Sequence, residues 1–93
     1  MNLEKSLDKM LKDKNYSFSN MKIKYIKEDD SLYVVYFEEL IRSVGNQLIY
    51  WINKKTGEYG DVYLPDNDNF ELLNRFESCD FVQIPEKYKN KYF

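Results

Sequence analysis

The stretch QLIYWINKKTGEYGDVYL, residues 47–64, decides the fold, because it predicts a β-hairpin. β-Branched and aromatic residues dominate both arms, which is typical of strands. Between the arms, residues 55–57 (KTG) suit a three-residue loop in which Gly57 adopts the left-handed conformation. In that register Lys54 lies opposite Glu58, and the two charges attract each other across the strands.

The register of this hairpin decides which side chains share a face, because successive strand residues point to opposite faces. A three-residue loop places an aliphatic set on one face: Leu48, Tyr50, Ile52, Val62 and Leu64. It places a polar and aromatic set on the other face: Ile49, Trp51, Asn53, Tyr59, Asp61 and Tyr63. A four-residue loop would shift the partners and mix the two sets. We therefore predict the three-residue loop and a second, aromatic face.

An amphipathic helix is predicted over residues 2–14, at the start of the chain. Its apolar residues recur with helical spacing and make one narrow stripe: Leu3, Leu7, Met10 and Leu11. Asn2 is placed to cap the first turn. The stripe predicts a helix that packs on a sheet, and the alternative is a helix that docks on a partner or on a second copy.

Two further strands are predicted between this helix and the hairpin, over about residues 21–28 and 31–41. In the first, alternation places Met21, Ile23 and Tyr25 on one side and lysines on the other. The second is rich in Tyr, Val and Phe on both faces. Residues 38–44 fit either the end of this strand or a helical turn.

A second helix is predicted over residues 67–78, after Pro65 ends the hairpin, and Asp68 with Glu71 matches a capping box. Residues 81–84 (FVQI) fit either an edge strand or a buried extended segment. A basic, aromatic tail follows over residues 85–93. The chain is therefore predicted to be one α+β domain, residues 1–93, with a four-stranded antiparallel β-meander on which the helices pack.

Composition predicts a globular protein of the cytoplasm. The 93 residues are 43% hydrophobic, 32% charged and 17% aromatic, which is not the composition of a disordered chain. The charged N-terminus has no signal-peptide core, and the one cysteine, Cys79, forms no internal disulfide. Lys, Asn, Ile and Tyr are abundant, and all four use AT-rich codons, which points to a low-GC bacterium or its phage.

The residues that most chemistry needs are missing, which predicts a protein that is not an enzyme. The chain has no histidine, one cysteine and three isolated glycines. The histidine-dependent nucleophile pairs, most zinc sites and the glycine-rich phosphate loops are therefore excluded. We expect no cofactor and no metal ion, and we expect Cys79 to be a packed residue at a helix end.

The acidic and aromatic residues of the sheet predict a surface that binds a protein. Residues 31–80 carry four basic and nine acidic side chains, which favours a basic partner over a phosphate backbone. Tyr and Trp are enriched where proteins bind each other. The expected partner-binding residues are Trp51, Tyr59, Asp61, Tyr63, Glu38, Glu39 and Glu58.

In general character, a small acidic chain of this kind resembles immunity proteins and phage anti-defence inhibitors. That resemblance implies steric and electrostatic inhibition of a basic, nuclease-like protein. The sequence fits either a monomer or a homodimer. The alternative is a nucleic-acid module in which bases stack on sheet aromatics. It would use a local lysine patch formed by the first strand (Lys22, Lys24, Lys27) and the tail (Lys87, Lys89, Lys91). No contact with a membrane is expected.

Overall fold

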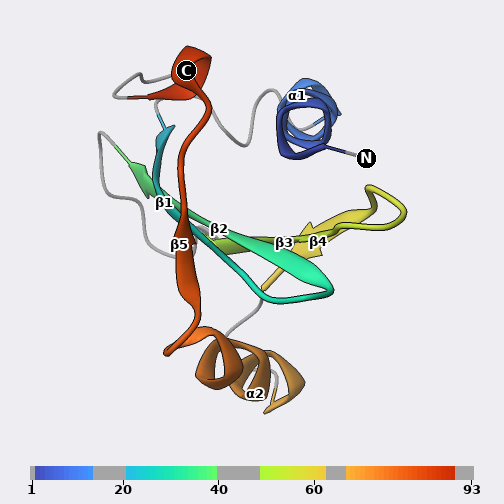
Figure 1. The fold of residues 1–93 in the computed structure, drawn as a ribbon, viewed down its shortest axis with the longest axis vertical. Coiled ribbons are helices and arrows are strands. Elements are labelled where there is room, and N and C mark those ends of the chain that lie inside the picture. The colour runs from blue at the N-terminus through green and yellow to red at the C-terminus, as the bar shows by residue number, and fades with distance from the viewer. Residues whose placement is uncertain (1, 14–20, 40–48, 63–66, 90–93) are drawn as a thin grey trace.

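The protein is an α+β structure in which one antiparallel sheet lies between two helices (Figure 1). The computed structural model describes residues 2–13, 21–39, 49–62 and 67–89, and for residues 67–70 the backbone alone. In chain order the elements are α1 (Leu3–Asp13), β1 (Met21–Glu28), β2 (Leu32–Glu39), β3 (Ile49–Asn53), β4 (Tyr59–Asp61), α2 (Asn67–Phe76), β5 (Asp80–Val82) and a 3-10 turn, η1 (Glu86–Tyr88). No helix within these described ranges is long and apolar enough to cross a membrane.

The sheet has five strands in the order β4-β3-β2-β1-β5, so the prediction of four strands is wrong. The additional strand, β5, pairs antiparallel with β1, with Val82 opposite Ile26 and Asp80 opposite Glu28. Three residues are too few to show a strand period in the sequence. Only the return of the chain after α2 places this segment against the open side of β1.

The first helix confirms its predicted apolar stripe. The Asn2 side chain accepts a hydrogen bond from the backbone N–H of Lys5 at 2.8 Å, which caps the first turn. Leu7 and Met10 are completely buried. Leu3 and Leu11 flank them and pack partly buried against the same core.

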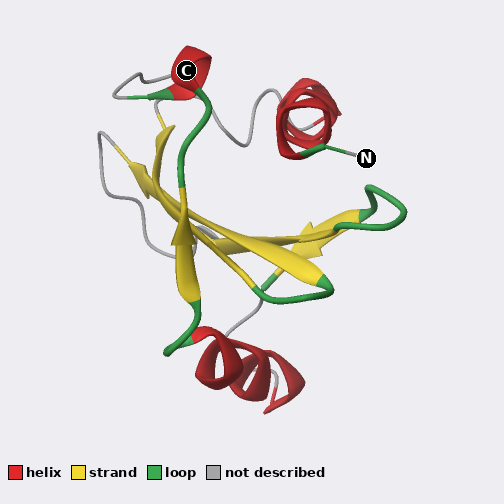
Figure 2. Ribbon diagram, in the orientation of Figure 1, coloured by secondary structure: helices red, strands yellow, loops and turns green. Residues whose placement is uncertain are grey.

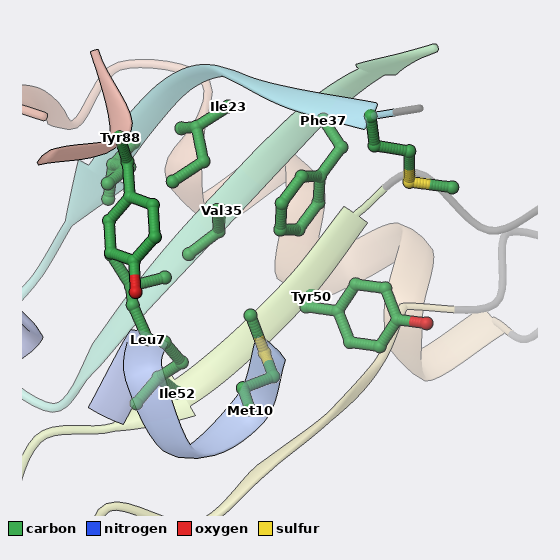
Figure 3. Packing of buried hydrophobic residues seen from close by; sticks show 10 residues of the cluster. Leu7, Met10, Ile23, Val35, Phe37, Tyr50, Ile52 and Tyr88 are labelled. Carbon is green, nitrogen blue, oxygen red and sulfur yellow. The ribbon is translucent and has the colours of Figure 1, made fainter. Parts of the chain in front are cut away.

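The main core fills the space between α1 and the sheet (Figure 3). Ile23, Val35, Phe37 and Ile52 rise from three neighbouring strands toward the helix. The Phe37 and Tyr50 rings meet edge to face, with centroids 5.9 Å apart. Each large apolar side chain buried in this way contributes about 1.5–3 kcal/mol to folding.

A β-bulge in β1 changes the faces predicted for that strand. The register shifts between Ile23, which pairs with Phe37, and Tyr25, which pairs with Tyr36. The additional residue, Lys24, sends Tyr25 to the face opposite Ile23, so the prediction that the two share a side is wrong. A regular alternation of side chains holds no sign of a bulge.

A second buried layer lies on the face that carries α2, which Figure 2 shows on the side of the sheet opposite α1. Val34 of β2, Val62 just after β4, and Phe76 of α2 have no exposed surface. Val34 and its neighbour Val35 are both buried because each face of β2 is covered. A helix on each face is the reason that β2 is apolar on both sides.

The end of β2 answers one of the open questions. Glu38 and Glu39 are strand residues and pair with Lys22 and Met21 of β1. The remaining predictions for residues 40–44, the Asp68 cap and the last residues of the tail, 90–93, lie outside the described side chains.

Candidate functional site

The predicted register of the hairpin is wrong by one residue. Trp51 pairs with Gly60, and Ile52 pairs with Tyr59, so the loop has four residues, 54–57. The cause is the Asn53 side chain, which accepts hydrogen bonds from the backbone N–H groups of Lys55 and Thr56 at 2.8 and 3.0 Å. These hydrogen bonds start the turn at residue 54, one residue before the predicted loop. Gly57 ends the turn with a φ of 78°.

The corrected register separates the residues expected to form one binding face. Trp51 lies on the face of α2, and its indole covers Gly60. A Cβ atom built at Gly60 would lie 2.7 Å from two carbons of that indole. Trp51 is half-buried in this position. It therefore packs across its own hairpin, as aromatic residues do over glycine in a neighbouring strand.

Tyr59 and Asp61 lie on the opposite face, together with Tyr50. The Tyr59 hydroxyl donates to the Asp13 carboxylate at 2.8 Å, which ties β4 to the end of α1. Burial, together with the hydrogen bond to Asp61, raises the pKa of Tyr50 to about 12. Tyr59 and Asp61, both predicted to bind a partner, therefore make contacts within the fold.

The predicted acidic residues are also dispersed. Glu38 is exposed and its carboxylate lies 3.5 Å from the Lys22 ammonium across the sheet, whereas Glu39 points to the other face. Glu58 is exposed at the hairpin loop. Tyr63 lies outside the described residues.

An aromatic row crosses three strands on the face of α2, and sequence reasoning missed it. It consists of Tyr36 on β2, Tyr25 on β1 and Phe81 on β5. The Tyr25 and Tyr36 rings are 4.4 Å apart, and the Phe81 ring meets Tyr25 edge to face at 5.5 Å. Phe81 is 69% exposed, the largest exposure of any large hydrophobic side chain among the described residues.

The aromatic row is bordered by lysines and is partly buried at its inner end. The Lys27 ammonium lies 5.0 Å from the centre of the Phe81 ring and donates a hydrogen bond to the Glu77 carbonyl at 2.9 Å. Burial, followed by the neighbouring Tyr25 and Cys79, raises the pKa of Tyr36. Exposure of the row is therefore concentrated at Phe81, on the outermost strand.

A cavity of about 340 Å³ opens at the end of the sheet, where the β1–β2 turn meets the segment after α2. We call it the acidic cavity. Its lining residues are Glu28, Asp29, Asp30, Lys54, Ser78, Cys79 and Asp80. Four of these side chains are carboxylates and one is an ammonium group, so the lining is acidic and favours a cation. Within the described residues, no group of three or more acidic, cysteine or histidine side chains is arranged to hold a metal ion.

The shape of the acidic cavity is maintained by hydrogen bonds and ion pairs around Asp29. Its carboxylate accepts the backbone N–H groups of Ser31 and Leu32, each at 2.8 Å, and pairs with the Arg75 guanidinium of α2. Partial burial acts to raise the pKa of Asp29, but these hydrogen bonds and Arg75 outweigh it and lower that pKa. Asp29 is therefore a structural anchor.

The other acids of the cavity differ in how much they are engaged. Glu28 pairs with Lys54 at 3.4 Å. Asp30 and Asp80 are exposed, so a cation from solution can reach their carboxylates. Cys79 donates its S–H to the Arg75 carbonyl at 3.2 Å, so its predicted role as a packed residue after the helix agrees with its contacts.

The sequence held weak signals for these features. The turn EDDS (28–31) and the dipeptide Cys79-Asp80 are each acidic or polar, but they are 50 residues apart and only the β1–β5 pairing joins them.

The predicted tail packs against the first helix. Tyr88 is buried against α1, and its hydroxyl donates to Asp8, which also pairs with Lys87 at 2.9 Å. Tyr88, which belongs to the predicted tail, is therefore part of the folded core.

Comparison with known proteins identifies no relatives: no family model matches the chain, and no curated protein or solved structure matches it significantly. A function for this chain must therefore be inferred from its own residues.

Proposed function

We propose that this chain is a non-catalytic protein that binds a basic protein partner and inhibits it by covering its surface. The observation that carries the proposal is the acidic cavity, where Asp30 and Asp80 remain exposed beside two anchored carboxylates. A lysine or arginine side chain of the partner would enter this cavity. Acidic clusters of this kind also accelerate the encounter with a basic partner.

The surroundings of the cavity support a protein as the ligand. Phe81 directly follows Asp80, so an exposed aromatic ring lies next to the acidic cavity. Interfaces combine an aromatic anchor with charged groups at its border. Contacts within the fold hold the two sides of the cavity together, since Arg75 ties the β1–β2 turn to α2 and the β1–β5 pairing joins Glu28 to Asp80.

The proposal is tested by charge reversal in the cavity. The tagged wild-type protein and the double variant Asp30→Lys with Asp80→Lys are used to capture proteins from lysate of the natural host at low and at moderate salt. A basic protein should co-purify in stoichiometric amount with the wild type. The captured protein is then purified, and its dissociation constant is measured for each variant.

We expect the double variant to bind this protein at least tenfold more weakly and with a smaller dependence on salt. The matched control, Glu71→Lys with Glu86→Lys, makes the same charge change at exposed positions outside the cavity. Equal affinity of the double variant and the wild type would overturn the proposal. Loss of binding in the control as well would show a general charge effect and would also contradict it.

A second candidate function is the binding of single-stranded nucleic acid, and the aromatic row favours it. Three rings in succession on one sheet, with Lys24 and Lys27 beside them, resemble a platform on which bases stack. The neighbouring carboxylates oppose a phosphate backbone. Fluorescence anisotropy with a labelled oligothymidine at low salt tests this candidate, and binding that is lost in Tyr25→Ala would support it.

A further inference from the structure

We infer that the partner presents charges of both signs to this chain, with an acidic side chain next to the basic side chain that enters the acidic cavity. This inference rests on the proposed function and names the chemistry of the surface that is recognised. The observation that carries it is a second cavity of about 240 Å³, which we call the basic cavity. The two cavities are neighbours, because Asp30 and Lys54 belong to the linings of both.

The two cavities differ in the sign of their charge. The acidic cavity is lined by four carboxylates and one ammonium group. The basic cavity is lined by two ammonium groups, one carboxylate and two uncharged side chains: Lys54, Lys55, Asp30, Ser31 and Asn53. Complementary charges select partners at an interface, because like charges that meet there weaken binding. A surface that fits both cavities therefore carries a basic group beside an acidic one.

Lys54, which the two cavities share, is engaged within the fold. Its ammonium group lies 3.4 Å from the Glu28 carboxylate and 4.8 Å from the centre of the Tyr33 ring. Its backbone N–H donates to the Ser31 carbonyl at 3.0 Å. Only 25% of its side chain is exposed. Lys54 and Glu28 therefore largely neutralise each other, and other residues provide the charges that a partner can meet.

The charges that remain for a partner have both signs. Asp30 and Asp80 line the acidic cavity, Lys55 lines the basic cavity, and all three are exposed. Within the described part of the chain, none of these three side chains forms an ion pair. The Asn53 side chain accepts the Lys55 backbone N–H at 2.8 Å, which fixes the backbone that carries the Lys55 ammonium. Asp30 and Asp80 would bind the basic group of the partner, and Lys55 would bind its carboxylate.

The test compares three peptides that differ in one side chain. They are acetyl-Gly-Arg-Asp-Gly-amide and the same peptide with Asn or with Lys in place of Asp, so the net charge rises from zero through one to two positive charges. Each peptide is titrated at low salt into the isotope-labelled full chain. The dissociation constant is obtained from the NMR shifts of the backbone amides of Asp30, Lys55 and Asp80.

We expect the Asp peptide to bind roughly threefold more tightly than the Asn peptide, which is the effect of one exposed ion pair. The Lys peptide should bind most weakly, because Lys54 and Lys55 repel its second charge. Attraction by acidic residues alone predicts the opposite order, since affinity then rises with the positive charge of the peptide. The variant Lys55→Glu should reverse the preference. The control Lys89→Glu makes the same charge change at an exposed position outside both cavities and should retain it.

The double variant Asp30→Lys with Asp80→Lys distinguishes failure of this inference from failure of the proposed function. If affinity rises with peptide charge and this variant abolishes binding, the acidic cavity binds basic groups, and the mixed-charge inference is wrong. An order of affinities that is unchanged in Lys55→Glu would also overturn the inference. If no peptide shifts these amides, or if the double variant binds all three peptides as the wild type does, the proposed function fails as well.

Discussion

Replacement of Gly60 by alanine tests whether Trp51 occupies the space above β4. In the structure, a Cβ atom at Gly60 would lie 2.7 Å from Cε2 and Cζ2 of Trp51 and 2.8 Å from Nε1. Non-bonded heavy atoms are most favourably about 3.5–4.0 Å apart, so the indole must move by roughly 1 Å. Gly57 is the described glycine with positive φ, which means that the backbone at Gly60 suits alanine.

The magnitude follows from two opposing effects. Overpacking of a folded interior costs about 1–3 kcal/mol. Replacing glycine by alanine where the backbone permits it contributes about 0.4–1 kcal/mol of stability. Because the half-buried indole can yield in part, we expect Gly60→Ala to lower the free energy of unfolding by about 1 kcal/mol. In a Trp51→Val background the ring is gone, and the same substitution should stabilise the protein by about 0.5 kcal/mol.

The assay is urea unfolding of the four proteins of this double-mutant cycle, followed by far-UV circular dichroism. A loss of 1 kcal/mol lowers the midpoint by about 0.5 M urea for a typical dependence on denaturant. The coupling free energy should be about 1.5 kcal/mol. Trp51 is the only tryptophan, so its emission should also shift in Gly60→Ala. An effect of equal sign and size in both backgrounds would refute the packing described here.

Substitutions at three further positions test other contacts. Gly57→Ala should destabilise the protein by about 1–2 kcal/mol in thermal unfolding, because φ is 78° there, and Gly57→Asn should cost less. Burial and Asp61 raise the pKa of Tyr50 from 10.0 to about 12, so this tyrosine ionises at lower pH in the unfolded chain than in the folded protein. The free energy of unfolding should therefore fall as the pH rises from 10 to about 12. Urea titrations at about pH 9 and 11 should show a smaller fall for Tyr50→Phe than for the wild type. The Tyr88 hydroxyl and Lys87 hold the pKa of Asp8 below 3.8, which contributes stability above that pH that is lost as pH falls further. Tyr88→Phe should therefore lose about 1 kcal/mol at neutral pH and show a shallower acid transition, and an unchanged acid transition would contradict that role.

The partner-binding residues predicted from the sequence do not share one face of the sheet. Every residue that the sequence predicts to bind a partner lies in the hairpin or at the end of β2, where aromatic and acidic residues are dense. The Asn53 side chain moved the hairpin register by one residue, which sent Trp51 and Tyr59 to opposite faces. A one-residue slip reverses every face assignment in a strand.

The sequence by itself determined the local elements. Helical spacing places Leu7 and Met10 on the buried side of α1, and Asn2 lies at its cap. These assignments depend on the sequence alone, because neighbours on a helix surface are only three or four residues apart in the chain. The α+β class and the antiparallel sheet followed from the same local periods. Those inferences needed no knowledge of distant residues.

Only the tertiary structure decided the features that depend on long-range pairing. The bulge at Lys24 turned Tyr25 toward the aromatic row, and the pairing of β5 with β1 brought Asp80 beside Glu28. That pairing joins segments about 50 residues apart and involves three residues of β5, too few to carry a periodic signal. The pairing of this fifth strand with β1 forms the acidic cavity and places the exposed Phe81 at the edge of the sheet. Because the pairing involves distant segments, the free energy that stabilises it comes from packing across the molecule.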